Sequence, residues 1–308
     1  MKKDLRIVFM GTPDFAVPSL QFLVENDYQV VGVITATDKY GGRGGKHLIE
    51  SAVKRYAVAQ NIPVLQPKNL KAADFQAELK ALNANLQVVV AFRMLPESVW
   101  AMPAYGTFNL HGSLLPKYRG AAPINWAVIN GEKETGVTSF FLKQQIDTGD
   151  MLFQESLPIG EDETAGEVHD RMMQLGAAVV LRSVQAVEKG DYELQAQNNE
   201  LATKAPKIYH DTCEINFNQS TQKVHNFIRG LSPYPAAWTT LDGLKLKVLR
   251  TTKLLEDHDL KAGNFSTDNK HFLRIATADG FVEVHELQLA GRKRMKTKDF
   301  LNGYKIGE

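Results

Sequence analysis

The chain has 308 residues, a length that suggests about two domains. Its 44% hydrophobic and 23% charged residues are typical of a globular protein, and a formal net charge of +1 excludes a uniformly basic nucleic-acid binder. No apolar run approaches the roughly 20 residues that span a bilayer, and the charged start, residues 1–4, lacks the features of a signal peptide. Cys213 is the only cysteine, so an internal disulfide is excluded. We therefore expect a cytoplasmic protein without membrane contact, in which Cys213 has no catalytic role.

The first 190 residues alternate short apolar runs with segments of helical periodicity. The apolar runs predict strands at 5–10, 29–35, 62–65, 86–92, 107–110, 136–142 and 151–157. Helical patterns lie at 17–26, 48–60, 72–82, 124–130 and 164–188. The last of these has Thr164 at the N-cap position and Glu167 three residues further on. This alternation predicts an α/β domain over 1–190 with a Rossmann-like, doubly wound and mostly parallel sheet.

The composition changes beyond residue 190. Residues 191–207 are polar and contain a proline, as expected of a linker. A helical pattern at 220–229 precedes strand patterns at 237–241, 244–249, 273–276 and 281–289, with Asp-Gly turns at 242–243 and 279–280. These short strands indicate a small barrel or sandwich over 208–308, and we expect a β-barrel of the OB type.

Polar side chains converge at the end of the expected strand 107–110. Asn109 and His111 lie two residues apart, so in a strand both side chains point to one face. Gly112 and Pro116 then end the strand, and ligands of such sheets bind beyond the carboxyl ends of their strands. Asp147 lies in a glycine-containing turn, 145–150, between two further expected strands.

These three residue types suit acyl transfer to an amine. Asn109 can donate its amide hydrogen to an oxygen that becomes anionic, and His111 can move protons near neutral pH. Asp147 can hold the imidazolium ring. No serine or cysteine lies in a nucleophile elbow, which favours direct transfer over a covalent acyl-enzyme. The eight histidines lack metal-ligand spacing, so we expect no metal site.

Other segments carry weaker signals. Gly11-Thr12-Pro13 follows the first strand as a nucleotide-binding loop would, but it lacks the glycine pattern and the lysine of such loops, so a structural turn is favoured. A glycine-rich loop at 37–46, expected to be mobile, carries three basic residues: Lys39, Arg43 and Lys46. A second basic cluster lies near the C-terminus and consists of Arg292, Lys293, Arg294, Lys296 and Lys298. That cluster is either a solvated turn or a phosphate-binding surface.

Four motifs of this chain resemble those of a known family. They are Met10-Gly11-Thr12-Pro13-Asp14-Phe15, the run from Asn109 to Pro116, Tyr118-Arg119-Gly120-Ala121-Ala122-Pro123, and Ile146-Asp147-Thr148-Gly149-Asp150. In order and spacing they resemble the methionyl-tRNA formyltransferases, which belong to the enzymes that use 10-formyltetrahydrofolate. The likeness runs over nearly the whole chain and weakens after about residue 205. One departure is Phe92-Arg93, where the family usually carries Tyr-Gly near the pterin pocket.

The resemblance implies a reaction and a set of roles. The α-amine of methionine on initiator tRNA would attack the formyl carbon of 10-formyltetrahydrofolate. Asn109 and protonated His111 would stabilise the oxyanion, and Asp147 would orient His111 and help to remove the amine proton. The folate would lie along the family's tetrahydrofolate motif, which here is Ser113, Leu114, Leu115 and Pro116.

The resemblance also assigns the basic segments to tRNA. Lys39, Arg43 and Lys46 would reach the end of the acceptor stem, with Arg43 the strongest candidate. Arg292, Lys293 and Arg294 would contact phosphates from a second domain. We expect a monomer. Three alternatives stay open: a formyltransferase that acts on a small amine, a hydrolase of 10-formyltetrahydrofolate, and a non-enzymatic binding module, which would leave the Asn/His/Asp set unexplained.

Overall fold

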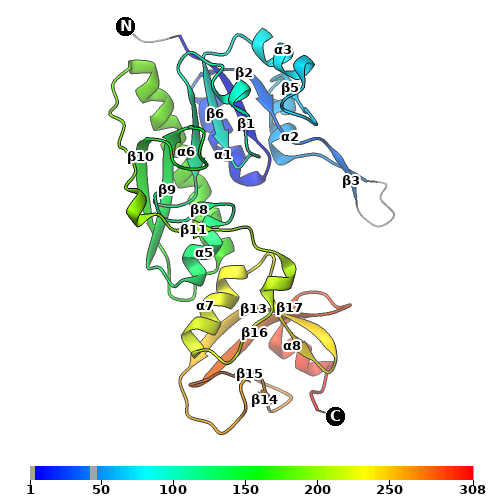
Figure 1. The fold of residues 1–308 in the computed structure, drawn as a ribbon. Helices are drawn as coiled ribbons and strands as arrows, with labels where there is room; N and C mark the ends of the chain where they lie inside the picture. The colour runs from blue at the N-terminus through cyan, green and yellow to red at the C-terminus, as the bar shows by residue number, and fades with distance from the viewer. Residues whose placement is uncertain (1–3, 42–46, 308) are drawn as a thin grey trace. The chain divides into compact units, whose positions relative to one another are not determined.

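The chain divides into two compact units in the computed structural model, which describes residues 4–41 and 47–307 (Figure 1). Unit 1 contains the described residues up to 119, together with 136–157 and 170–204. Unit 2 contains 120–135, 158–169 and the residues from 205 onward. Each unit therefore combines stretches that are separated in the sequence.

A seven-stranded sheet forms the centre of unit 1. Its order is β10 (Met151–Pro158), β9 (Glu134–Phe141), β7 (Thr107–His111), β6 (Leu86–Val90), β1 (Arg6–Gly11), β2 (Gln29–Ile34) and β5 (Val64–Leu65). The pairs from β5 to β7 are parallel, whereas β9 pairs with β7 in the antiparallel sense. The central strands β1 and β6 are apolar and buried, as strands covered on both faces must be. The expected mostly parallel α/β sheet is confirmed.

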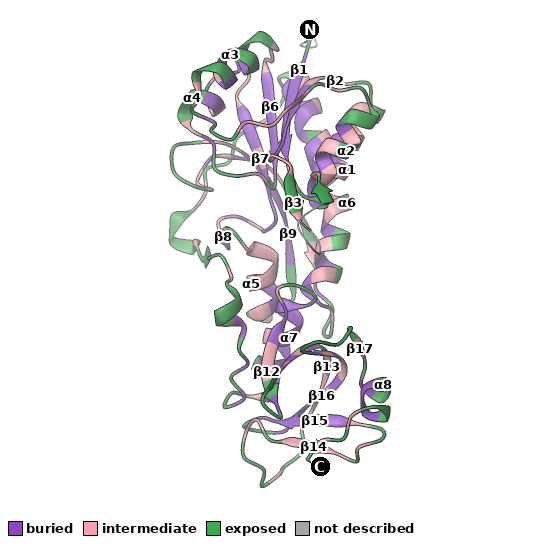
Figure 2. Ribbon diagram, turned by 90° about the vertical axis from the view of Figure 1, so that its right-hand side faces the viewer, coloured by how far each residue is buried: buried purple, intermediate pink, exposed green. Residues whose placement is uncertain are grey.

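Helices cover both faces of this sheet (Figure 2). On one side lie α3 (Ala73–Ala81) and α4 (Glu97–Trp100), where Phe75 and Val99 pack against buried side chains of the central strands. On the other side lie α1 (Val17–Glu25), α2 (Ala52–Ala59) and the part of α6 (Ala165–Lys189) that belongs to unit 1. The sequence predicts all of these helices except the four-residue α4.

The start of α6 follows its expected capping residues. The hydroxyl of Thr164 accepts a hydrogen bond from the Glu167 backbone N–H (3.3 Å), and the Glu167 carboxylate accepts one from the Thr164 backbone N–H (2.8 Å). This reciprocal pair is a capping box, which satisfies donors that a helix start leaves without partners.

Unit 2 is built on an antiparallel sheet. Its strands run in the order β12 (Ala237–Leu241), β13 (Leu244–Leu254), β16 (Phe281–Leu289), β15 (Leu273–Ala276) and β14 (Phe265–Thr267), and β17 (Met295–Lys296) pairs with β16. The path ends at β12 and at β14 without closing, so the sheet is an open half-barrel. The expected β fold class of the C-terminal part is confirmed. The sequence missed β14, β17 and α8 (Thr297–Asn302), and predicted an end to β13 at residue 249.

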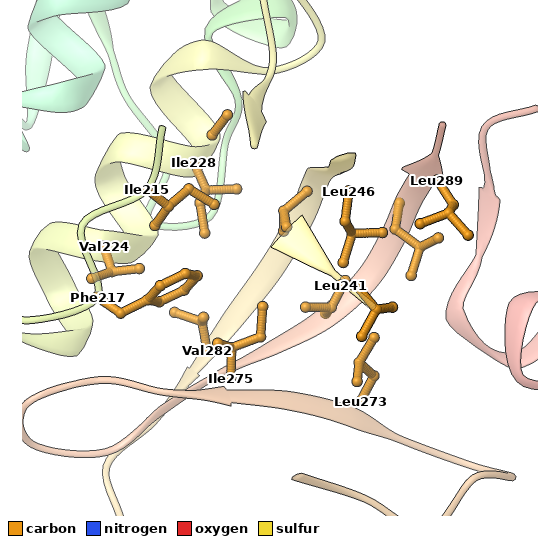
Figure 3. Close-up of a cluster of buried hydrophobic side chains, with 14 of the residues drawn as sticks. Ile215, Phe217, Val224, Ile228, Leu241, Leu246, Leu273, Ile275, Val282 and Leu289 are labelled. Carbon is orange, nitrogen blue, oxygen red and sulfur yellow. The ribbon is translucent and has the colours of Figure 1, made fainter. Parts of the chain in front are cut away.

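The core of unit 2 lies between this sheet and α7 (Thr221–Leu231). Figure 3 shows Val224 and Ile228 of α7 facing side chains of the strands, among them Leu246 and Val282. On another face α7 contacts α5 (Pro123–Ile129), where the Asn125 amide donates to the backbone oxygen of Gly230 (2.8 Å). The contact explains why residues 120–135 group with the C-terminal half of the chain.

His225 is a titratable group sealed inside unit 2. Its side chain is completely buried, with Nδ1 2.9 Å from the Thr251 hydroxyl and Nε2 3.1 Å from a carboxylate oxygen of Asp162. Burial lowers the pKa of His225 from 6.5 to about 4; Asp162 opposes this change, and the charges of Arg229 and Lys253 reinforce it. The ring is therefore neutral at physiological pH.

The structure changes the expected bounds of the glycine-rich loop and of the helix that follows it. Lys39–Gly41 forms a short strand, β3, which pairs with β4 (His47–Ile49), so part of the expected loop 37–46 is a hairpin arm. Residues 42–46 lie outside the described residues. The helix expected from residue 48 begins at Ala52, because the Ser51 side chain caps it by accepting a hydrogen bond from the Lys54 N–H (3.0 Å).

Candidate active site

Strand β7 aims Asn109 and His111 at the same side of the sheet. Between them, Leu110 packs against α6: a Cβ added at Gly176 of that helix would lie 2.7 Å from the Leu110 side chain. Since side chains alternate along a strand, Asn109 and His111 point away from α6. His111 is 6% exposed and pairs in register with Thr138 of β9, while Asn109 is partly exposed.

The two ring nitrogens of His111 have different surroundings. Nε2 lies 2.8 Å from the backbone oxygen of Tyr118. A carbonyl oxygen only accepts, so Nε2 carries a hydrogen and donates it. Nδ1 lies 3.9 Å from Oδ2 of Asp147. This distance suits an ion pair and is too long for a hydrogen bond, so a proton on Nδ1 produces an imidazolium beside a carboxylate.

The backbone of the 145–150 turn determines where Asp147 lies. Asp147 has a φ of +54°, in the left-handed region that few residues other than glycine adopt. Two residues on, a Cβ at Gly149 would lie 1.6 Å from the backbone oxygen of Phe141. The Phe141 N–H also donates to the backbone oxygen of Asp150 (3.0 Å). The turn therefore lies directly against β9, and only glycine fits at position 149.

The segment 112–117 follows β7 and is held by polar groups of two other strands. The Thr138 hydroxyl donates to the backbone oxygen of Ser113 (2.7 Å) and accepts from the Leu115 N–H (3.0 Å). The Gln154 amide donates to the backbone oxygen of Leu115 (2.7 Å) and to the Thr138 hydroxyl (3.0 Å). Sequence reasoning missed Thr138 and Gln154, and nothing local marks Thr138, because β9 contains other polar residues such as Thr135 and Ser139.

The four residues expected to bind folate are not equally accessible. Ser113 and Leu115 are buried, and the Ser113 hydroxyl donates to the backbone oxygen of Lys117 (2.6 Å). Leu114 and Pro116 are partly exposed, and the Leu115–Pro116 peptide is cis. Of these four side chains, only those of Leu114 and Pro116 are therefore accessible from outside.

Residues 195–204, within the expected linker, bind the residues that follow β7 and the start of β10. The Thr203 hydroxyl accepts from the Tyr118 N–H (2.8 Å), and the Thr203 backbone oxygen accepts from the Arg119 N–H (2.9 Å). Gln195 exchanges two backbone hydrogen bonds with Met151 at the start of β10. The chain is thus tied to the residues after β7 and to the start of β10 well beyond the end of α6.

Two further motifs have structural explanations. The Pro13 backbone oxygen accepts from the Ala16 N–H (3.1 Å) and closes a single 3-10 turn, Asp14–Ala16, before α1. Arg93, the departure from the family pattern, donates to the backbone oxygens of Lys68 (3.0 Å) and Pro67. Its guanidinium thus joins the segment after β6 to the segment after β5.

The basic residues expected to bind tRNA lie in both units. Lys39 is exposed on β3, whereas Arg43 and Lys46 lie outside the described residues. Arg292, Lys293 and Arg294 are exposed just before β17. The Arg292 guanidinium lies 5.3 Å from the Tyr304 ring centroid, and Arg294 forms an ion pair with Glu286. The triplet is thus partly ordered by a strand and by local contacts.

No helix within 4–41 and 47–307 has the length and apolarity needed to cross a membrane. Over those ranges, no group of three or more histidine, cysteine or acidic side chains is arranged as a metal site.

Comparison with known proteins identifies the family. Residues 5–184 match the family model described as formyl transferase, and 207–305 match the one described as formyl transferase, C-terminal domain. A methionyl-tRNA formyltransferase of Parabacteroides distasonis is 54% identical over 315 residues, covering 99% of this chain and 97% of the relative. The chain belongs to the methionyl-tRNA formyltransferase family. A second relative of that name, from Phocaeicola vulgatus, is 54% identical over 100% of this chain and 98% of its own.

Solved structures share the fold. The sugar 3N-formyl transferase WlaRD, solved in the presence of dTDP and 5-N-formyl-THF, has a TM-score of 0.69 at 21% identity, over 94% of this chain and 100% of its own. HypX from Aquifex aeolicus, in complex with tetrahydrofolic acid, has a TM-score of 0.67 at 18% identity, over 99% of this chain and 49% of its own. Membership of the methionyl-tRNA formyltransferase family confirms the resemblance stated from the four motifs.

Proposed function

We propose that this protein transfers the formyl group of 10-formyltetrahydrofolate to the α-amine of methionine on initiator methionyl-tRNA. The observation that carries the proposal is the 54% identity, over 99% of the chain, to a protein named methionyl-tRNA formyltransferase. The identity spans both parts of the chain, so it includes the C-terminal β-domain. The sugar N-formyltransferases, by contrast, share little more than the fold at 21% identity.

The geometry on β7 supports direct transfer. As the amine attacks the formyl carbon, the Asn109 amide and the proton on His111 Nδ1 donate to the oxygen that becomes anionic. Since Nε2 is bound to the Tyr118 backbone oxygen, Nδ1 is the nitrogen that presents this proton. Asp147 stabilises the imidazolium across 3.9 Å and accepts the proton that the attacking amine releases. One proton then passes to N10 of the folate as its bond to the formyl carbon breaks, so protons balance.

The folate, as we propose, lies along Ser113, Leu114, Leu115 and Pro116. Leu114 and Pro116 supply apolar contact for the ring system, because their side chains are partly exposed. Thr138 and Gln154 hold the backbone of this segment through three hydrogen bonds of 2.7–3.0 Å, and a fourth joins the two side chains. The folate supplies the formyl group, and the chain supplies its orientation.

The tRNA contacts are proposed at the two basic segments. Lys39, Arg43 and Lys46 would reach the acceptor end, and Arg292, Lys293 and Arg294 would contact phosphates. Residues 1–190 are the proposed catalytic domain, 191–207 the linker and 208–308 the tRNA-binding β-barrel domain. We further propose that the enzyme is a cytoplasmic monomer.

A formyl-transfer assay tests the proposal. The purified protein is incubated with 10-formyltetrahydrofolate and methionyl initiator tRNA, with methionyl elongator tRNA and with no acceptor. We expect rapid transfer only to the initiator. Turnover of the folate without an acceptor would identify a hydrolase. Transfer to small amines alone would identify a formyltransferase that acts on small molecules.

Two substitutions test the assigned roles. Asn109→Ala and His111→Ala should each reduce kcat by two to three orders of magnitude, because an oxyanion donor lowers the barrier by about 3 kcal/mol. Thermal unfolding serves as the control for folding. Near wild-type turnover in either folded variant would contradict the mechanism.

A further inference from the structure

We propose that Gln197 and Arg119 are positioning residues that hold Asp147 in place for catalysis. This inference rests on the proposed function, because it assigns the two residues to the same reaction. Neither residue was a candidate on sequence grounds. Gln197 lies in the expected linker, and Arg119 in a motif to which no role has been assigned so far.

The Gln197 side chain donates hydrogen bonds at one end of its amide and accepts them at the other. Its amide nitrogen donates to the backbone oxygens of Asp147 (2.9 Å) and Gly149 (2.8 Å). Its amide oxygen accepts from Nε (3.1 Å) and Nη2 (2.6 Å) of Arg119. Carbonyls only accept and a guanidinium only donates, so the amide has one possible orientation.

These contacts act on the backbone that carries the carboxylate. Asp147 adopts a left-handed conformation, which costs a residue other than glycine free energy unless its surroundings hold it. A single donor draws the backbone oxygens of residues 147 and 149 together and so fixes the turn. The direction of the Asp147 side chain, and with it the 3.9 Å separation from His111 Nδ1, follows from that backbone.

Adjacent residues anchor the two members of the catalytic pair. The Tyr118 backbone oxygen holds Nε2 of His111, and the Arg119 side chain acts through Gln197 on Asp147. Thr203 in turn binds the backbone N–H groups of both Tyr118 and Arg119. The Nη2 group of Arg119 also donates to the Asn199 side-chain oxygen (2.7 Å), which fixes the guanidinium plane. Residues 197–203 thus help to position both His111 and Asp147.

Two substitutions at position 197 separate the contacts. Gln197→Met keeps the size of the side chain and removes both sets of hydrogen bonds. Gln197→Glu keeps an acceptor for Arg119 but turns a carboxylate oxygen toward two backbone oxygens. Gln195→Met is a matched control, because the exposed side chain at 195 lies outside the network and its contacts to Met151 come from the backbone.

The kinetic test compares kcat with KM. Both Gln197 variants should lose about ten- to a hundredfold in kcat, since a misplaced catalytic group costs rate steeply. KM for each substrate should stay within about twofold, because neither residue is assigned to substrate binding. Arg119→Lys should lose less than Gln197→Met, since a lysine keeps one donor toward the Gln197 oxygen. Gln195→Met should match the wild type.

A double-substitution cycle shows whether Gln197 acts through Asp147. In an Asp147→Ala background, Gln197→Met should change kcat by less than about twofold, because the group that it positions is absent. Losses that multiply would overturn the proposal, as would a folded Gln197→Met variant with wild-type kcat. If Gln197→Met fails to fold, Gln197→Glu and Arg119→Lys carry the same cycle.

A crystal structure of Gln197→Met provides a readout that does not depend on activity. We expect the 145–150 turn to move and Oδ2 of Asp147 to lie farther than 3.9 Å from His111 Nδ1. An unchanged turn would overturn the positioning role whatever the enzyme does. A wild-type protein that fails to formylate methionyl-tRNA would instead refute the proposed function, and the two failures are thereby distinguished.

Discussion

The buried His225 makes the stability of unit 2 depend on pH. In the folded unit its pKa is about 4, whereas the unfolded chain has the ordinary value of 6.5. Between these values the unfolded chain binds a proton that the folded unit does not. The free energy of unfolding therefore falls as the pH drops from about 6.5 toward 4, and the contribution of His225 is fully present above that window.

The size of the effect follows from the difference between the two pKa values, 6.5 − 4 = 2.5. At about 1.4 kcal/mol per pKa unit, the whole transition amounts to about 3 kcal/mol. About 2 kcal/mol of this should be lost between pH 7 and pH 5, where the unfolded chain is protonated and the folded unit is still mostly neutral.

Urea unfolding of the wild type and of His225→Asn at pH 7 and pH 5 measures this loss of unfolding free energy. Asparagine can keep a hydrogen bond to Thr251 but does not titrate in this range. The wild type should lose about 2 kcal/mol more than the variant between the two pH values, because all other groups titrate in both proteins. Equal losses would refute the reasoning, since they would show that His225 takes up its proton in the folded unit as readily as in the unfolded chain.

Three further predictions concern the site and the tRNA. Replacing the basic triplet 292–294 by alanine should weaken tRNA binding and make its dependence on salt shallower, while Lys80→Ala on α3 should do neither; titrations at several salt concentrations decide this. Gly149→Ala should abolish turnover or folding, because the new Cβ would lie 1.6 Å from the Phe141 backbone oxygen; activity and circular dichroism measure the two outcomes. Thr138→Val removes a buried hydroxyl that serves three hydrogen bonds, so it should cost about 1–3 kcal/mol of stability and raise the KM for 10-formyltetrahydrofolate.

Most of unit 1 could be predicted from its sequence because its elements follow one physical pattern. Buried strands such as β6, with sequence LQVVV, are apolar runs. The long helix α6, most of which lies in unit 1, was predicted from its capping residues Thr164 and Glu167, although these two residues belong to unit 2. The antiparallel direction of β9 could not be predicted, since an apolar run gives no direction. In unit 2, β14 and β17 are three and two residues long and carry no periodicity to detect.

Some residues of the candidate site could be found from the sequence, and others could not. Asn109 and His111 could be found because the spacing along one strand places them on one face. Asp147 could be found because its turn has a local signature with Gly149. Gln197 lies 50 residues from Asp147 in a polar stretch, and nothing local marks its side chain as the donor to that turn. Long-range hydrogen bonds of this kind depend on the folded path of the chain.

The path of residues 195–204 bears on how such enzymes can be recombined. A chimera joined at the end of α6, near residue 190, would bring a foreign segment against Tyr118, Arg119 and the turn that carries Asp147. Exchange of the C-terminal part would then alter turnover together with the proposed tRNA-binding surface. A junction after Lys204 keeps the native segment with the native strands. The exchanged part would also meet residues 120–135 and 158–169, which belong to the same unit, so these two stretches have to be exchanged with it.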